Sequence, residues 1–186
     1  MPRVLFIHSA GSQGEGEGSS AFLAKLRAEL GPAYAVDGPL MPNPDAPEAR
    51  PWLDAVGGLI ARAKGPFALV GHSLGGSIIL KWLAENPLPG GLVGVVTIAA
   101  PFWGARDWDV SEFALPQDAG ARLAKVPRIV LFSGRSDKVV PAEHLTLYAD
   151  AVPGIETATV DGDHEFANGD IGAVAEAIRL LPGFRD

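Results

Sequence analysis

The sequence contains no cysteine, has fewer cationic than anionic side chains and includes no long apolar run. Without cysteine, the chain can form no disulfide, supply no thiolate nucleophile and hold no metal through sulfur. Its 15 lysines and arginines stand against 22 aspartates and glutamates, for a formal net charge of −7, and no run of basic residues occurs. We therefore expect neither nucleic acid nor an anionic membrane surface as a partner.

The N-terminal segment MPRVLFIHSAG carries one basic residue and a short apolar run, Val4–Ile7. That run is too short for the core of a signal peptide and far too short to span a bilayer, so we expect a cytoplasmic protein with no membrane partner. The length of 186 residues, with 47% hydrophobic and 20% charged residues, suits one domain over residues 1–186 with a full hydrophobic core. The oligomeric state stays open.

Five segments are short, apolar and bounded by glycine or proline, which is the pattern of strands buried on both faces. These segments are Arg3–His8, Phe67–Val70, Leu92–Ala99, Arg128–Phe132 and Glu156–Val160. A weaker strand is expected at Tyr34–Asp37. Between the strands, helical patterns occupy Ser19–Leu30, Pro51–Ala63, Gly76–Glu85, Pro141–Ala151 and Ile171–Leu181.

The ends of two of these helices carry recognisable signals. Ser19 or Ser20 is expected to cap the first helix, because serine at this position accepts a hydrogen bond from a free backbone N–H. Pro141 is expected in the first turn of the fourth helix, where its missing N–H costs nothing. The sustained alternation predicts an α/β fold, a three-layer α/β/α sandwich around a mostly parallel six-stranded sheet. Such sheets bind ligands at the carboxyl ends of their strands.

Two irregular stretches, Gly38–Arg50 and Pro101–Val126, interrupt the alternation. The second is rich in aromatic side chains, namely Phe102, Trp103, Trp108 and Phe113. They could form the wall of a substrate pocket for an acyl or alcohol group, with Phe166 nearby. They could equally pack the insert onto the body of the domain. The sequence leaves both interpretations open.

The turn Gly71-His72-Ser73-Leu74-Gly75 joins a predicted strand to a predicted helix. G-x-S-x-G arises by chance in glycine-rich chains, so its setting carries most of the specificity. A serine on such a tight turn adopts a strained backbone conformation with its hydroxyl exposed above the sheet, and the glycines leave room for closely passing elements. We predict that Ser73 is a nucleophile; the alternative is an ordinary capping serine.

A serine hydroxyl needs an adjacent imidazole, itself oriented by a carboxylate. Of the four histidines, His164 lies in the loop after the last strand, where a base serving Ser73 should be found. His72 neighbours the nucleophile and should point elsewhere, and His8 should shape the oxyanion loop. His144 should lie on a solvated helix face. We therefore predict His164 as the base.

Asp137 follows the strand Arg128–Phe132 and completes the chain order Ser, Asp, His that is typical of one family of hydrolases. Its rivals for the role of the acid are Asp107 and Asp109 in the long insert, and Asp161 and Asp163 beside the histidine. The last two would have to fold back sharply to reach the same ring. Asp137 is the prediction.

An oxyanion hole should use the backbone N–H of Leu74 and a second N–H from the loop after the first strand, with Ala10 the first candidate and Gly11 the next. No metal and no cofactor are expected, because no second histidine lies at ligand spacing from His164. A nucleotide-binding loop at Gly11–Gly18 is the main rival. It does not match G-x-G-x-x-G or the P-loop, and its glutamates would repel a phosphate. A flexible loop bordering the oxyanion hole is the simpler interpretation.

The segments FIHSAG, GHSLGG, SGRSDKVVP and GDHEF together resemble an α/β-hydrolase from end to end. More narrowly, the chain is similar to the compact serine hydrolases grouped with YdeN and the retinoblastoma-binding serine hydrolases. The resemblance implies a triad of Ser73, Asp137 and His164, no separate cap domain and the hydrolysis of carboxylic esters. Ser9 departs from the pattern, since many relatives have glycine there.

The residues and the resemblance together predict a serine hydrolase that acts on a small-molecule ester, with short-chain carboxylesters as the first assay substrates. Thioesters, small amides and lactones stay open, because the same triad serves all of them. A non-catalytic interaction protein that keeps the fold is the rival from another class.

Overall fold

The computed structural model of the chain describes residues 1–106, 108–166 and 168–184. Six strands lie at β1 (Arg3–Ile7), β2 (Ala35–Asp37), β3 (Phe67–His72), β4 (Leu92–Ile98), β5 (Ile129–Gly134) and β6 (Glu156–Val160). The helices are α1 (Gly18–Leu30), α2 (Ala49–Arg62), α3 (Leu74–Glu85), α4 (Ala119–Leu123), α5 (Glu143–Ala151) and α6 (Ile171–Arg179), with a 3₁₀ turn at Ser111–Phe113.

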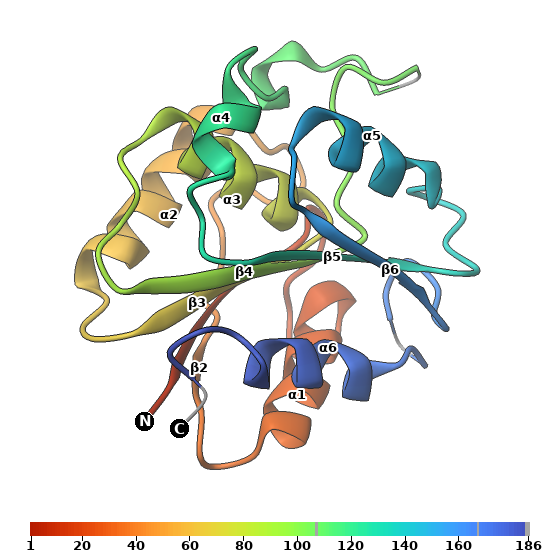
Figure 1. Cartoon of the computed structure of the whole chain (residues 1–186). Coiled ribbons are helices and arrows are strands. Elements are labelled where there is room, and N and C mark those ends of the chain that lie inside the picture. Colours follow the sequence, from red (N-terminus) through yellow and green to blue (C-terminus); the bar gives the residue numbers. More distant parts are fainter. Residues whose placement is uncertain (107, 167, 185–186) are drawn as a thin grey trace.

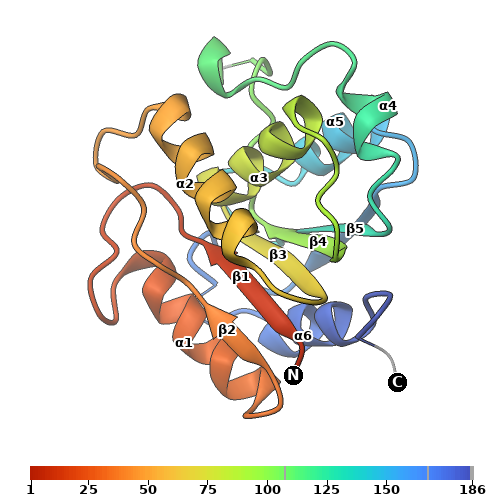
Figure 2. The same cartoon turned by 90° about the vertical axis from the view of Figure 1, so that its left-hand side faces the viewer.

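The strands form one sheet in the order β2-β1-β3-β4-β5-β6, and every neighbouring pair is parallel. Helices α1 and α6 cover one face of the sheet, and α2, α3, α4 and α5 cover the other (Figure 1). Seen from the side of β2, α1 and α2 lie on opposite sides of the edge strand (Figure 2). The predicted three-layer α/β/α architecture with a six-stranded sheet is therefore confirmed.

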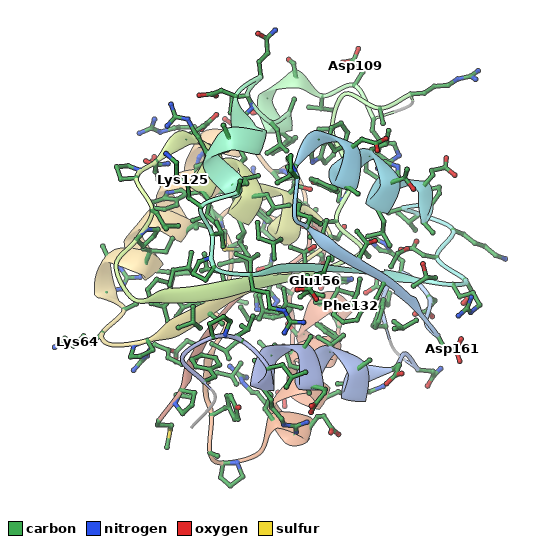
Figure 3. The ribbon with its side chains drawn as sticks, in the orientation of Figure 1. Lys64, Asp109, Lys125, Phe132, Glu156 and Asp161 are labelled. Atoms are coloured by element: carbon green, nitrogen blue, oxygen red, sulfur yellow. The ribbon has the colours of Figure 1, made fainter. Side chains whose placement is uncertain are left out.

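The strands form because their side chains are apolar on both faces, which only a sheet covered on both sides can bury. One hydrophobic cluster joins β1, β3 and β4 to α2, α3 and α5. The second joins the other face of the sheet to α1 and α6, and Figure 3 labels one of its members, Phe132 of β5. Among the described residues, no helix has both the length and the apolarity needed to cross a membrane.

Three local predictions are wrong. The N-cap of α1 is Glu17, and Ser19 lies inside the helix with its hydroxyl turned into the core. Helix α5 is capped by Ala142, so Pro141 precedes the helix. The insert Pro101–Val126, expected to be irregular, contains the 3₁₀ turn and the short helix α4.

Candidate active site

The turn after β3 has the strained serine that the sequence predicts. Ser73 lies between the last strand residue, His72, and the first helical residue, Leu74. Its backbone has φ 50° and ψ −120°, a conformation that residues other than glycine rarely adopt. A Cβ on Gly75 would lie 2.3 Å from the carbonyl oxygen of Ile7, and one on Gly71 would lie 2.6 Å from the nitrogen of Gly76. Both glycines are required because β1, β3 and α3 approach one another too closely for a side chain.

The structure brings Ser73, His164 and Asp137 together from the carboxyl ends of three strands. The hydroxyl of Ser73 lies 3.1 Å from Nε2 of His164, and Nδ1 of the same ring lies 2.9 Å from Oδ2 of Asp137. The Asp137 side chain is fully buried, whereas that of His164 is 14% exposed. The His164 ring is thus slightly open to solvent and the carboxylate beside it is closed off, and the distances are those that proton transfer from a serine hydroxyl to an imidazole would use.

The carboxylate of Asp137 also accepts hydrogen bonds from the backbone of the residues that follow it. Oδ1 accepts hydrogen bonds from the N–H groups of Val139, at 2.8 Å, and Val140, at 2.9 Å. Burial alone would raise the pKa of Asp137, but the hydrogen bond and charge of His164 and these two N–H donors outweigh it and lower the pKa. Asp137 is therefore held as a carboxylate facing the ring.

The rival acids lie elsewhere or outside the described residues. Asp161 pairs with Arg135 at 3.2 Å and is 86% exposed, and Figure 3 shows it at the end of β6. Asp109 is exposed on the insert, at the outer edge of the molecule (Figure 3). Asp163 is also exposed. Asp107 lies outside the described residues.

The loop after β1 is connected to the core by a chain of hydrogen bonds. The N–H of Ser9 donates to Oγ of Ser19 at 3.1 Å, and that hydroxyl lies 2.8 Å from Nδ1 of His8. The other ring nitrogen of His8 donates to the carbonyl oxygen of Gly38 at 3.2 Å, which leaves Nδ1 free to accept from Ser19. Burial is the main cause that lowers the pKa of His8.

Of the three consecutive loop residues Ser9, Ala10 and Gly11, two have backbone N–H groups that are already bonded. The N–H of Gly11 donates to the carbonyl oxygen of Pro44 at 2.8 Å, and that of Ser9 is bonded to Ser19. Ala10 lies between them and lines the cavity beside Ser73 and Leu74. Of the two loop residues that the sequence leaves open, Ala10 has the available donor in the described structure. Nearby, the buried Gln13 side chain donates to the carbonyl oxygen of Ser9 at 2.9 Å, so the first part of the glycine-rich loop is anchored.

His144 does not lie on a solvated face, which corrects the prediction. It is 4% exposed, and its Nδ1 accepts a hydrogen bond of 2.8 Å from the N–H of Phe102. Burial is the largest cause that lowers the pKa of His144. Together with Tyr148 and Ser77, whose hydroxyls both donate to the carbonyl oxygen of Pro101 at 2.7 and 2.8 Å, it anchors the start of the insert.

The anchored insert places part of its aromatic set beside the catalytic candidates. A cavity of about 360 Å³ is lined by Ser9, Ala10, Pro47, Ser73, Leu74, Pro101, Trp103, Trp108, Phe113, Val139, His164 and Glu165. The rings of Trp103 and Trp108 meet edge to face at 5.2 Å, and Trp103 also contacts Phe113 at 5.0 Å. Three of the predicted aromatics therefore line a cavity beside Ser73, and the binding of an acyl or alcohol group in that cavity stays a prediction.

Two of the predicted aromatics are not in the cavity wall. Phe102 packs edge to face on Tyr148 at 5.0 Å, and the fully buried Phe166 packs against Phe22 at 5.9 Å. Conversely, the wall includes residues that were not among the predicted site residues, and three of them are Pro47, Val139 and Glu165. The last two could have been found from their position next to the predicted acid and base. Pro47 carries no such signal.

No group of three or more histidine and acidic side chains within the described ranges is arranged to hold a metal ion. The fold and this serine turn are those of an α/β-hydrolase. The model of the alpha/beta hydrolase family matches residues 4–182 of the chain, and the chain belongs to that family.

Among solved structures, the ydeN gene product from B. subtilis is similar to this chain, with a TM-score of 0.77 and 20% identity over 96% of this chain and 97% of the other. A pyrethroid hydrolase from Sphingobium faniae JZ-2 has a TM-score of 0.67 and 18% identity over 95% of each chain. The esterase domain of a Rhodothermus marinus protein has a TM-score of 0.66 and 20% identity over 95% of this chain and 84% of the other. No curated protein matches the chain in sequence. The predicted resemblance to YdeN is confirmed at the level of the fold.

Proposed function

We propose that this protein is a serine hydrolase that cleaves carboxylic esters, with Ser73 as nucleophile, His164 as base and Asp137 as the acid that orients the base. The observation that carries the proposal is the continuous contact from the Ser73 hydroxyl to Nε2 of His164, at 3.1 Å, and from Nδ1 to Asp137, at 2.9 Å. The family membership and the esterase and hydrolase names of its structural neighbours support the same class.

In the proposed reaction, Oγ of Ser73 attacks the ester carbonyl while its proton passes to Nε2 of His164. Asp137 accepts the hydrogen bond of Nδ1–H and stabilises the imidazolium that forms. His164 then gives the proton to the departing alkoxide, which leaves as the alcohol. Water attacks the acyl-enzyme while His164 takes one of its protons, and His164 then returns that proton to Oγ of Ser73 as the carboxylic acid product leaves.

The negative charge of the tetrahedral intermediate needs donors that point to it before the reaction starts. The N–H groups of Leu74 and Ala10 fill this role in the proposal, since both residues line the cavity at Ser73. Leu74 is also the first residue of α3, so the positive end of the helix dipole faces the same charge. One such donor contributes about 3 kcal/mol of transition-state stabilisation.

The cavity wall favours an uncharged ester with an apolar group. Its described lining is mostly aromatic and aliphatic, with Trp103, Trp108 and Phe113 as the largest side chains, and it includes no lysine or arginine that could hold a carboxylate substrate. Glu165 adds a negative charge beside the base, which disfavours anionic esters further. A small-molecule ester such as a p-nitrophenyl alkanoate is the substrate class to test first.

The decisive experiment compares the wild type with Ser73→Ala on p-nitrophenyl acetate and with a fluorophosphonate probe. We expect turnover and labelling in the wild type and neither in the variant, while circular dichroism shows that both are folded. Wild-type turnover by Ser73→Ala would refute the proposed nucleophile. A folded wild type that neither labels nor turns over any ester, thioester or amide in a substrate panel would favour a non-catalytic role.

A further inference from the structure

His164 is hydrogen-bonded to two consecutive residues, the last residue of β3 and the serine that follows it, one through its side chain and the other through its backbone. Its side chain meets the hydroxyl of Ser73 at 3.1 Å through Nε2. Its backbone carbonyl oxygen lies 2.7 Å from Nε2 of His72. The end of β3 and the serine after it therefore contact both the backbone and the ring of His164, across 92 and 91 residues of sequence.

The direction of the second bond is fixed by chemistry. A carbonyl oxygen only accepts, so Nε2 of His72 carries the hydrogen and Nδ1 does not. Among the described residues, Nδ1 of His72 is buried without a hydrogen-bond partner. A proton added there would be a buried donor with no acceptor, and burial first, then the charge of His164, lowers the pKa of His72 to about 4. Near neutral pH, His72 is a neutral donor with one fixed direction.

The surroundings leave the His72 ring little freedom. The residue is fully buried, and its ring lies 5.7 Å from that of Phe22 and 5.4 Å from that of His164. Elsewhere the loop of His164 is tied through the carbonyl oxygen of Gly162, which accepts from both the N–H and the hydroxyl of Ser136. The bond from His72 acts at residue 164 itself, directly beside the Ser73 hydroxyl.

We propose that His72 is a positioning residue for His164: its Nε2–H holds the carbonyl oxygen of His164 and so fixes the distance between the His164 ring and the Ser73 hydroxyl. The inference rests on the proposed function, in which that distance decides how readily the proton moves. The neutral state of the His72 ring also favours this proton transfer. The His164 ring becomes cationic when it takes the serine proton, and a second cation at His72 would oppose that step.

Two substitutions separate the hydrogen bond from the packing. His72→Phe keeps a ring among aromatic neighbours but has no donor, whereas the amide nitrogen of His72→Gln can replace Nε2. A misplacement of about 1 Å costs about 100-fold in rate, so we expect His72→Phe to lower kcat about 100-fold with KM changed less than about threefold. His72→Gln should stay within about fivefold of the wild-type kcat. Should His72→Phe not fold, His72→Met takes its place, because methionine is adaptable and also lacks a donor.

Phe22→Leu is the matched control, since the Phe22 ring packs against the His72 ring at 5.7 Å and takes no part in the hydrogen bond to His164. It should reduce stability and leave kcat unchanged. A folded His72→Phe variant with kcat within about twofold of the wild type would overturn the proposal. So would an equal loss in folded His72→Gln and His72→Phe, because packing would then explain the effect.

A crystal structure of His72→Phe supplies a readout that does not depend on turnover. We expect the distance from Oγ of Ser73 to Nε2 of His164 to exceed hydrogen-bond range. An unchanged distance would overturn the positioning role even if Ser73→Ala had already shown that Ser73 is not the nucleophile. Conversely, loss of activity in Ser73→Ala together with an unchanged distance in His72→Phe would leave the proposed function standing and refute this inference.

Discussion

Asp137 meets His164 with one carboxylate oxygen while its other oxygen is bonded to its own chain. Oδ2 lies 2.9 Å from Nδ1 of His164, and Oδ1 accepts from the N–H groups of Val139 and Val140. The turn that supplies these donors therefore determines which oxygen faces the imidazole. The different partners of the two oxygens also determine how the side-chain amide of an asparagine at position 137 would be oriented.

Asp137→Asn should be nearly inactive although it is almost the same size. Its carbonyl oxygen will take the site of Oδ1, because the two N–H donors require an acceptor, and its NH₂ group will then face Nδ1 of His164. The ring must then carry its hydrogen on Nε2 and cannot accept the serine proton. A matched substitution in a Ser-His-Asp enzyme lowers kcat by about 10⁴-fold. Steady-state kinetics on p-nitrophenyl acetate measure the loss.

Asp109→Asn is the control for that prediction, since Asp109 is an exposed carboxylate on the insert. It should retain the wild-type kcat. If Asp109→Asn were as inactive as Asp137→Asn, the assignment of the acid would be wrong. Asp107→Asn belongs in the same set, because the sequence offers it as a rival.

Gly75→Ala should disrupt the fold around the serine turn. The added Cβ would lie 2.3 Å from the carbonyl oxygen of Ile7 and 2.5 Å from that of His8, and both are backbone atoms that cannot turn aside. We expect a loss of about 3 kcal/mol or more in the free energy of unfolding, measured by urea denaturation. Gly90→Ala is the control, because nothing lies within 4 Å of its added Cβ. Equal stability of the two variants would contradict the close approach of β1 to α3.

The strands and the serine turn could be predicted because their signals are local. Runs such as Leu92–Ala99 are apolar on both faces, so the pattern itself shows that both faces are covered, and β4 differs from it by one residue at the end. Gly71 and Gly75 mark close contacts that any such turn makes. The contacts of His164 with Ser73 and with Asp137 follow from three parallel strands ending at one edge of the sheet.

Polar residues at buried positions could not be predicted in the same way. The sequence around His144 offers no hydrogen-bond partner for its ring, so it predicts a histidine in solvent. The actual partner, the N–H of Phe102, is 42 residues away. Serine is a residue type that often caps helices, but the hydrogen-bond partners of Ser19 are His8 and Ser9 in the preceding segment. The cavity wall is a product of the same long-range packing, which explains why Pro47 was missed.

Acid should destabilise the protein in the range where histidines titrate. Burial lowers the pKa of His8, His72 and His144 below 6.5, and that of His72 to about 4. As the pH falls through 6.5 the unfolded chain binds protons that the folded chain does not, so the stability present above pH 6.5 is lost toward pH 4. His72 alone accounts for about 2 kcal/mol between pH 7 and pH 5.

Urea denaturation at pH 7 and pH 5 tests this, with His72→Gln as the comparison. The variant should lose less free energy of unfolding over that interval than the wild type, by about the same 2 kcal/mol. The carboxylates with lowered pKa, such as Asp137, lose their contribution at lower pH and do not enter this window. The same pH dependence in both proteins would show that His72 does not fold as a neutral ring.

Trp108→Ala should change which esters the protein prefers. The Trp108 ring lies edge to face on Trp103 at 5.2 Å and on His144 at 5.4 Å, and it forms part of the cavity wall. Its removal widens the cavity, so kcat/KM for p-nitrophenyl octanoate relative to the acetate should rise about tenfold. Phe102→Leu should leave the ratio unchanged, because Phe102 packs on Tyr148 outside the cavity. An unchanged ratio in Trp108→Ala would mean that the aromatic residues only pack the insert.

Ser19→Ala tests whether the loop of Ala10 is held from beneath. The hydroxyl of Ser19 accepts from the N–H of Ser9 and lies 2.8 Å from Nδ1 of His8, so its removal leaves two buried groups unpaired. Each costs about 1–3 kcal/mol, so urea denaturation should show a loss of about 2–6 kcal/mol for the two groups together. Because Ser9 precedes the proposed oxyanion donor, kcat should also fall, by about tenfold.

Ser20→Ala is the control that distinguishes support of the Ala10 loop from a stabilising effect on the start of α1. Ser20 is the other residue expected to cap α1, and its hydroxyl donates to the carbonyl oxygen of Gln13 at 2.9 Å, further along the loop. It should cost less stability than Ser19→Ala and leave kcat within about twofold of the wild type, since it does not touch Ser9. If both variants lost stability equally and neither lost kcat, the bond between Ser19 and Ser9 would serve the helix alone. A loss of kcat confined to Ser19→Ala would instead tie the placement of Ala10 to a hydroxyl buried beneath the loop.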